Sequence, residues 1–100
     1  MEHTKVIIDQ DGTGQIQLYS EGHNAGLMEI AINGTVLSVF HTEVFRQYEG
    51  KGFAKILLGA LVDLAKQKGL KINPLCPYVH MQFKRHASEY RDIWFRRITP

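Results

Sequence analysis

Residues 44–58 read VFRQYEGKGFAKILL, and this stretch decides the fold of the chain. The residues before it, 35–44, are rich in β-branched side chains, which favour a strand. From Phe53 onward, apolar residues recur at the spacing of one helix face. The tripeptide Gly50-Lys51-Gly52 lies between the two. The stretch therefore predicts a strand, a glycine-flanked lysine and a helix start, whose free backbone N–H groups and positive end attract phosphate.

The residues on the N-terminal side of this stretch have the pattern of an antiparallel sheet. Four runs of β-type residues are separated by turn residues, and they span 5–8, 15–20, 25–32 and 35–44. Asn33-Gly34, between the last two runs, is the strongest hairpin signal in the chain. The first 44 residues are therefore expected to form a four-stranded antiparallel meander.

The residues on the C-terminal side predict one long helix and a short fifth strand. The helix is expected to end at Gly69, which follows a lysine-rich turn in the manner of a C-terminal cap residue. Residues 71–76 read as a strand, and Pro74 within it indicates an edge or splayed position. A meander, a crossover helix and a fifth strand predict an α+β fold with a mixed sheet.

Two shorter helices are expected after the fifth strand. Pro77 suits the first turn of a helix over residues 77–85. Ser88 is interpreted as the N-cap of a last short helix. An apolar stripe on that helix, expected in the core, consists of Tyr90, Ile93 and Trp94.

The length of 100 residues predicts a single domain, 1–100. The lone cysteine, Cys76, excludes an internal disulfide and fits a reducing cytoplasm. No apolar run approaches the roughly 20 residues of a membrane helix, and the N-terminal residues lack the pattern of a signal peptide. We therefore expect a cytoplasmic protein with no membrane partner.

The charges are unevenly distributed along the chain. Residues 1–50 hold two Lys or Arg residues and seven Asp or Glu residues. Residues 51–100 hold ten Lys or Arg residues and three Asp or Glu residues. The basic half suggests an anionic ligand on that side, although charge alone also fits a two-sided surface without a ligand. Nucleic acid is not expected, because the basic residues are scattered and carry no RNA-binding or helix-turn-helix signature.

The residues now described resemble those of a known family. The segment around Gly50-Lys51-Gly52 looks like the acetyl-CoA-binding segment of the GCN5-related N-acetyltransferases (GNAT), whose signature is Q/R-x-x-G-x-G/A. The signature positions are interpreted as Glu49, Gly50, Lys51, Gly52, Phe53 and Ala54. The residues around His41-Thr42-Glu43-Val44, around Cys76 and at His86 to Tyr90 further resemble a small stand-alone subgroup of about 100 residues. The resemblance covers most of the chain, from about Leu18 to Ile93.

The resemblance implies a GNAT-like fold, acetyl-CoA as cosubstrate and a set of residues that bind it. The fourth and fifth strands splay apart in this family, and the pantetheine arm lies in the gap against the backbone of the fourth strand. Glycine residues at the helix start let the backbone approach the pyrophosphate. The implied cofactor-binding residues are Thr42, Glu43, Val44, Gly50, Lys51, Gly52, Phe53, Ala54, Lys55 and Cys76.

Two positions depart from the family pattern. Glu49 stands where the signature has Gln or Arg, and a carboxylate there weakens phosphate binding unless it points away or Lys51 and Lys55 offset it. After the fifth strand the family carries Asn, then Ala at +3, then Tyr at +7 as the usual general acid. The corresponding residues here are Cys76, Val79 and Phe83. The usual phenol is therefore absent.

Cys76 is the first candidate for the chemistry. By position it would lie near the thiol end of the pantetheine arm and just before a helix N-terminus, a place that favours a thiolate. It can accept the acetyl group as a nucleophile, serve as the acid that Phe83 cannot be, or form a mixed disulfide with CoA. The alternative is a buried cysteine that acts as a small apolar residue.

His41 and Glu43 are the other catalytic candidates, because residues two apart on a strand share one face. His41 is a suitable base for an ammonium acceptor, and Glu43 can orient it or bind the amine. The alternative is a half-buried histidine in the sheet and a charge at a strand end. Tyr78 is a second candidate acid. No metal is expected, because His80 and His86 have no third ligand at a usable spacing.

The resemblance implies an acetyl-CoA-dependent N-acetyltransferase. The family usually has two helices between its first strands and a final hairpin, which wall the acceptor site. A short turn replaces the helices here, so we expect an open acceptor side and a protein or peptide amine as acceptor. The alternative function is a CoA- or acyl-CoA-binding module without efficient transfer, and a weaker one is a structural adaptor that uses the Trp94 surface. We expect a monomer or weak dimer.

Overall fold

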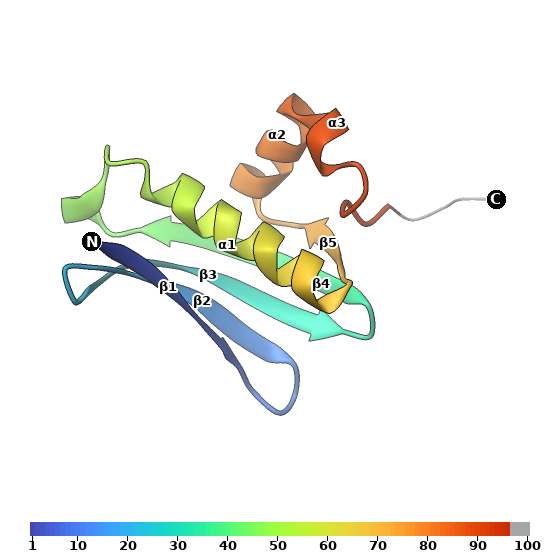
Figure 1. Ribbon diagram of the computed structural model, residues 1–100, viewed down its shortest axis with the longest axis horizontal. Coiled ribbons are helices and arrows are strands. Elements are labelled where there is room, and N and C mark those ends of the chain that lie inside the picture. The colour runs from blue at the N-terminus through green and yellow to red at the C-terminus, as the bar shows by residue number, and fades with distance from the viewer. Residues whose placement is uncertain (97–100) are drawn as a thin grey trace.

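The computed structural model describes residues 1–96 and contains a five-stranded sheet and four helical segments (Figure 1). The strands are β1 (Glu2–Ile8), β2 (Thr13–Ser20), β3 (His23–Asn33), β4 (Val36–Val44) and β5 (Lys71–Pro74). The helices are η1 (Arg46–Tyr48), α1 (Phe53–Lys68), α2 (Pro77–Arg85) and α3 (Ala87–Tyr90). Arg97, counted above among the basic residues, lies outside the described residues.

The sheet follows chain order, β1-β2-β3-β4-β5. The first three pairings are antiparallel, and β4 pairs with β5 in parallel across the connection through α1. Asn33 pairs with Val36 around a two-residue turn in which Gly34 has φ 61°, a conformation that glycine adopts at little cost. The predicted meander, crossover helix and fifth strand are thus confirmed, and the fold is a GNAT-like α+β fold.

The molecule has two layers, because α1, α2 and α3 all lie on one side of the sheet (Figure 1). The strand residues that face α1 form the core and are almost fully buried: Ile16, Leu18, Met28, Ile30, Leu37 and Val39. No described helix covers the opposite face of the sheet. None of the described helices is long and apolar enough to cross a membrane.

Helix α1 forms and ends as its sequence predicts. Leu57 and Leu61 are fully buried against the sheet, one turn apart on the same helix face. At its C-terminal end Gly69 has φ 65°, and Leu70 donates its N–H to the carbonyl of Ala65. That bond satisfies a terminal carbonyl in the manner of a glycine cap.

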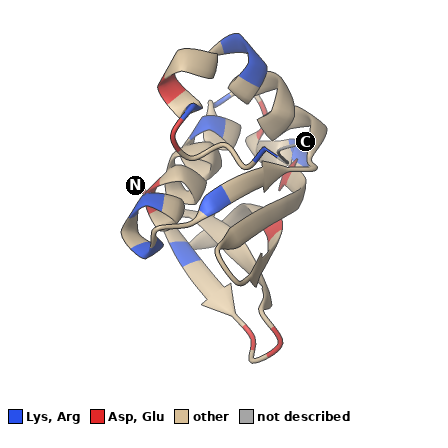
Figure 2. Cartoon of the chain, turned by 90° about the vertical axis from the view of Figure 1, so that its right-hand side faces the viewer, with Lys and Arg blue, Asp and Glu red and all other residues tan. Residues whose placement is uncertain are grey.

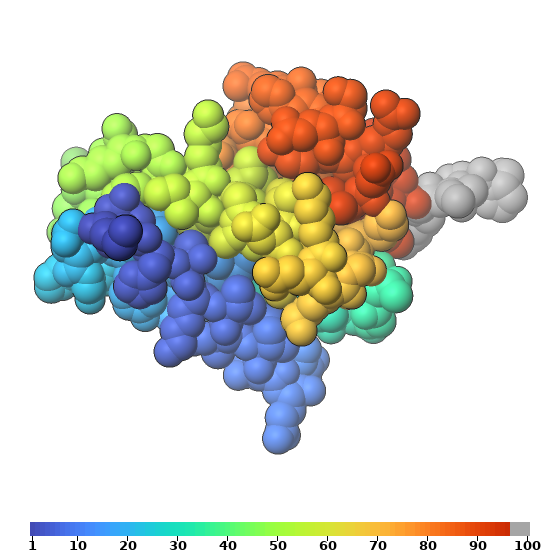
Figure 3. Space-filling view, viewed as in Figure 1, coloured from blue at the N-terminus to red at the C-terminus, as the bar shows by residue number. Residues whose placement is uncertain are grey.

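Helices α2 and α3 form a second lobe above α1, while the β1–β2 hairpin projects from the opposite side (Figure 3). Aromatic side chains hold this lobe together. Phe83 is fully buried, stacks on Tyr90 at 4.5 Å between ring centroids and meets Trp94 edge-on at 5.5 Å. Such pairs add to the stabilisation that burial already gives.

The predictions for the C-terminal end were partly wrong. Helix α3 begins at Ala87 with His86 as N-cap, so Ser88 lies inside it, and Trp94 lies outside the helix in a bridge to Ile72. Backbone bonds from Ile72 to the carbonyl of Ile93 and from the residue after Trp94 to the carbonyl of Ile72 explain the difference. The open edge of β5 offers unpaired groups, and pairing with them replaces further helix.

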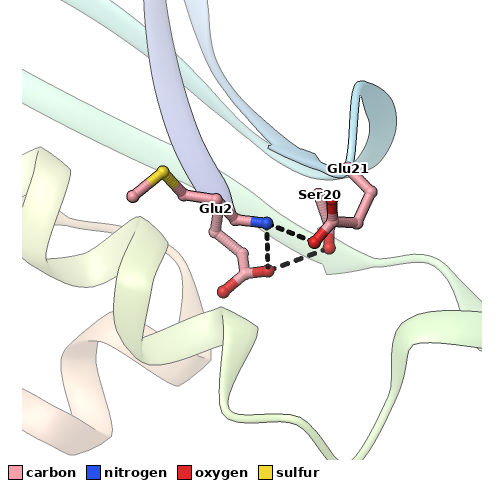
Figure 4. A network of polar contacts seen from close by, with 4 residues as sticks. Glu2, Ser20 and Glu21 are labelled. Atoms are coloured by element: carbon pink, nitrogen blue, oxygen red, sulfur yellow. Dashed lines mark hydrogen bonds and ion pairs between the residues drawn. The ribbon is translucent and has the colours of Figure 1, made fainter.

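A small polar network joins the start of β1 to the end of β2 (Figure 4). The ammonium of Met1 bonds the carboxylate of Glu21, and the hydroxyl of Ser20 donates to Glu2 at 3.0 Å. The hydrogen bond from this ammonium, and then its charge, hold the pKa of Glu21 below its ordinary value. The network therefore supports the register of the outermost pair of strands.

We expect Leu57→Ala to lower the free energy of unfolding by about 2 to 5 kcal/mol, because it leaves a cavity between α1 and the sheet. Lys66→Ala, on the exposed side of the same helix, should change it by less than about 0.5 kcal/mol. Urea unfolding measures both values. Similar losses for the two variants would contradict the assignment of the core.

Candidate functional site

The pairing of β4 with β5 ends halfway along β4. Only Val36 to Val39 pair with β5, and the last pair is Val39 with Pro74. From His41 to Val44, β4 pairs with β3 but has no strand on its other side among residues 1–96, and Phe40 pairs with neither neighbouring strand. Pro74 has no N–H to extend the ladder. The predicted splay is therefore present as an open backbone edge, and residues 75–76 leave the sheet instead of completing a strand to Cys76.

The open edge of β4 directs backbone donors outward. Phe45 donates its N–H to the carbonyl of Ala25 in β3. Because the N–H groups of a strand alternate in direction, the N–H of Val44 then points to the open side. An extended ligand placed in this gap can bond the backbone there.

Cys76 closes the inner end of this gap. Its N–H donates to the carbonyl of Val39 at 2.8 Å, and the residue is the N-cap of α2. Its side chain is 3% exposed, and its Sγ lies 3.2 Å from Oγ1 of Thr42. The structure thus brings Thr42 and Cys76 together on the helix side of the sheet.

His41 and Glu43 lie on the opposite face. Thr42 pairs with the buried Met28, whereas His41 pairs with Glu29, so the two sets of side chains project to different sides. His41 Nε2 lies 3.5 Å from Glu43 Oε1, and both side chains are about half exposed. His41 and Glu43 therefore lie next to each other as predicted, but the sheet separates both side chains from Cys76.

The loop before α1 has the backbone of an anion cradle. Gly50 and Gly52 have φ of 80° and 78°, and Gly52 is the N-cap of α1. The helix has no side-chain cap and no acid in its first turn. No atom lies within 4 Å of where a Cβ would stand at either glycine, so backbone conformation, not crowding, requires glycine here. The first N–H groups of α1 need a partner that the described side chains do not supply.

The structure also favours a different register for the glycine signature. Read from Gln47, the residues Gln-Tyr-Glu-Gly-Lys-Gly satisfy Q/R-x-x-G-x-G/A in full. In that register both glycine positions are the residues with positive φ, Gly50 and Gly52, whereas the register from Glu49 places Ala54 at one of them. Glu49 then occupies a free position, and its departure from the family pattern disappears. Gln47 is thus the first residue of the signature, and the complete match of residues 47–52 to the pattern is the sequence signal that identifies it.

A groove of about 280 Å³ runs between α1 and the α2–α3 lobe. It is lined by Lys55, Leu58, Gly59, Gln82, His86, Glu89 and Tyr90. Lys55 therefore faces a space that also holds His86. Lys84 and Arg85 line a different groove with Pro77, so they do not join Lys55.

The aromatic residues near Cys76 differ in exposure. Phe83 is fully buried and offers no hydroxyl, as the sequence indicates. Tyr78 packs partly buried against the core. Burial, and then the charges that Tyr90 and Cys76 would carry when ionised, raise the pKa of the Tyr78 phenol. The phenol therefore stays protonated, as a proton donor must be.

The charges follow the two layers. Lys and Arg residues are concentrated on the helices, while acidic residues mark the tip of the β1–β2 hairpin (Figure 2). No three His, Cys, Asp or Glu side chains within residues 1–96 come close enough to hold a metal ion. The basic side of the molecule is thus the side that carries the glycine loop and the groove beside α1.

Comparison with protein families gives one match. A family model described as GCN5-related N-acetyl-transferase matches residues 15–93, which is most of the chain. No curated protein sequence matches this chain significantly.

Several solved structures share the fold. The ribosomal-protein-alanine N-acetyltransferase of Brucella melitensis has a TM-score of 0.69 at 15% identity, with 100% of this chain and 96% of that chain covered. A GCN5-like protein of Staphylococcus aureus has a TM-score of 0.65 at 20% identity, with 94% of this chain and 90% of that chain covered. The ribosomal-protein-S18-alanine N-acetyltransferase of Escherichia coli has a TM-score of 0.64 at 16% identity. The match covers 74% of this chain and 66% of that chain, so this chain spans slightly less than two thirds of that enzyme.

One further neighbour was solved with a ligand. A Bacillus anthracis protein in complex with acetyl coenzyme A has a TM-score of 0.60 at 14% identity. The match covers 79% of this chain and 48% of that chain.

We expect Gly26→Ala and Gly59→Ala to change stability in opposite directions. A Cβ at Gly26 would lie 2.5 Å from the carbonyl oxygen of Glu43 and displace the open part of β4, at a cost of about 1 to 3 kcal/mol. At Gly59, inside α1 and with open space around it, alanine should add about 0.5 to 1 kcal/mol. Urea unfolding checks the two signs, and equal effects would contradict the close contact of β3 with the open part of β4.

Proposed function

The chain belongs to the GCN5-related N-acetyltransferase family, and from this membership we propose that it is an acetyl-CoA-dependent N-acetyltransferase. The observation that carries the proposal is the open edge of β4, Phe40 to Val44, between the glycine loop and Cys76. Together they provide a phosphate cradle, a row of backbone donors and a thiol in the order that an acetyl-CoA molecule needs.

The proposed binding mode assigns each part of acetyl-CoA to residues of one continuous surface. The N–H groups from Gly50 to Lys55 hold the pyrophosphate, where the positive end of α1 adds about 0.5 to 1 kcal/mol per well-placed anionic group. The pantetheine arm lies along the backbone of Thr42, Glu43 and Val44. Lys51 in the glycine loop and Lys55, which lines the groove with His86, supply positive charge that suits the remaining phosphate.

The proposed reaction uses both faces of the sheet. An acceptor amine, deprotonated by His41 or by water, attacks the thioester carbonyl, whose oxygen is polarised by the N–H of Val44. A carbon–nitrogen bond forms and the carbon–sulfur bond breaks. The amine proton goes to the base, and the CoA thiolate takes a proton from Cys76 or Tyr78. His41 and Cys76 lie on different faces of the sheet, which supports entry of the acceptor amine from one face and of acetyl-CoA from the other.

Cys76 can alternatively act as a transient acetyl carrier. In that case its sulfur takes the acetyl group from CoA and then passes it to the amine. Its place beside the open edge of β4 supports either role, and its low exposure restricts access to groups that enter the gap.

A second candidate function is a CoA- or acyl-CoA-binding module without efficient transfer. The complete burial of Phe83 favours it, because the position that carries the usual acid is filled by an apolar ring. The two candidate functions share the binding site and differ in the fate of the acetyl group.

We expect acetyl-CoA to stabilise the protein by about 2.7 kcal/mol at one hundred times its dissociation constant. Gly52→Glu should abolish this gain in a thermal denaturation assay, because the carboxylate enters the phosphate cradle. Gly34→Glu is the matched control, since Gly34 also has positive φ and open space but lies in the β3–β4 turn. No stabilisation of the parent protein at millimolar acetyl-CoA would reject both candidate functions, and a retained gain in Gly52→Glu would reject the cradle.

We expect Cys76→Ala to reduce acetyl transfer to a peptide amine by roughly a hundredfold while acetyl-CoA still stabilises the variant. Tyr78→Phe is the parallel variant, and the larger loss identifies the proton donor. Mass spectrometry of the parent protein after incubation with acetyl-CoA shows whether Cys76 gains an acetyl group or a CoA adduct. Transfer by Cys76→Ala at the parental rate would remove this residue from the reaction.

A further inference from the structure

The uncovered face of the sheet carries a row of side chains in register across four strands. Ile7 in β1 pairs with Gln15, Gln15 pairs with Glu29, and Glu29 pairs with His41 in β4. Directly paired residues project to the same face, so these four side chains form one line. The line begins at the outer edge of the sheet and ends at the strand that borders the gap beside Cys76.

A groove of about 470 Å³ runs along three members of this row, Ile7, Gln15 and Glu29, and His41 is the next residue of the row beyond its lining. It is lined by Ile7, Asp9, Thr13, Gly14, Gln15, Glu29, Ile30 and Phe40. Phe40 enters the groove because it is the extra residue of a β-bulge, between the pairs of Val39 with Ile30 and His41 with Glu29. Its side chain is 47% exposed and leaves an apolar surface beside the carboxylate of Glu29.

The charges on this face favour a cation. Asp9 and Glu29 line the groove, and Glu43 lies on the same face two residues beyond His41. Strand alternation places two lysines on this side, Lys5 of β1 and Lys71 of β5, and the amine of Lys71 bonds the carbonyl of Asp92. The groove therefore combines an apolar wall with an excess of negative charge.

The length of the row favours a polypeptide over a small amine. Three strand spacings separate Ile7 from His41, which corresponds to about 14 Å. An extended chain covers that distance with about four residues, since each residue adds roughly 3.3 Å. The inner end of such a segment would reach His41, which is the proposed base.

We propose that this groove docks a flexible, positively charged polypeptide segment and delivers one of its lysine amines to His41. The inference rests on the proposed function, because it identifies the acceptor of the same site. Glu29 pairs with a cation next to the reacting lysine, and Phe40 covers an apolar side chain of the segment. The glycine loop and α1 take no part in holding it.

The test uses a blocked hexapeptide, N-acetylated and amidated, of sequence Ala-Lys-Leu-Ala-Lys-Ala, added to the ¹⁵N-labelled protein with CoA present. We expect the amide signals of Ile7, Gln15, Glu29 and Phe40 to shift. Glu29→Lys should weaken the peptide about tenfold, because it turns an attractive exposed pair into a repulsive one. Asp63→Lys, an equal charge change on the exposed side of α1, should change the dissociation constant less than about twofold.

The competing outcomes are separable. Equal effects of Glu29→Lys and Asp63→Lys, signal shifts confined to the helices, or faster acetylation of n-butylamine than of the peptide would each overturn the docking groove. Self-association that Phe40→Ser abolishes in sedimentation would overturn it in favour of a second copy of the chain. Peptide shifts on this face in a protein that acetyl-CoA does not stabilise would reject the proposed function and retain the groove.

Discussion

The end of the pairing between β4 and β5 is the constraint on which the site depends. Val39 pairs with Pro74, which cannot donate a further ladder bond, and the next donor along this edge is the N–H of Cys76. That bond anchors the start of α2 to β4 at the point where the strands separate. The same few residues therefore hold the gap open, place a thiol at its inner end and set the direction of the helix that forms one wall.

The single layer of helices gives the two faces of the sheet different tasks. The helix side carries the buried residues, the glycine loop and most of the basic side chains. The other side carries exposed apolar and acidic side chains, and the side chain of His41 lies on the same side. A ligand that bonds the open edge of β4 meets both sides, because the edge is where the sheet is interrupted. The proposed anionic cosubstrate and cationic acceptor would thus meet at one point without competing for the same surface.

The sequence predicted those parts of the fold that depend on local patterns. The change of period at Phe53 and the glycine cap at Gly69 each have a local physical cause, and each is present. The Asn33-Gly34 signal also marks a hairpin, although its two turn residues are Gly34 and Thr35 because Asn33 still pairs with Val36. The parts it missed depend on contacts between distant residues. The bulge at Phe40 has no local signal, and the return of Trp94 to Ile72 depends on an open strand edge far along the chain.

The site was predictable to a similar extent. The sequence indicated the glycine loop, the pairing of His41 with Glu43 and the place of Cys76 just before a helix, since all three follow from spacing and motif. It did not indicate that the sheet separates His41 from Cys76, because facing depends on the register with β3. Within the proposed reaction, that separation assigns His41 to the acceptor amine and the protonation of the thiolate to a donor on the helix side.

The nature of that donor is coupled to the packing of the second lobe. Phe83 is enclosed by Tyr90 and Trp94, and a phenol hydroxyl in its place would be buried beside aromatic rings. A buried hydroxyl without a partner costs about 1 to 3 kcal/mol, a large fraction of the stability of a small domain. Phenylalanine avoids that cost in a protein of this size. In the proposed reaction the proton then comes from another group, and Cys76, whose Sγ lies 3.2 Å from Oγ1 of Thr42, stands beside the open part of β4.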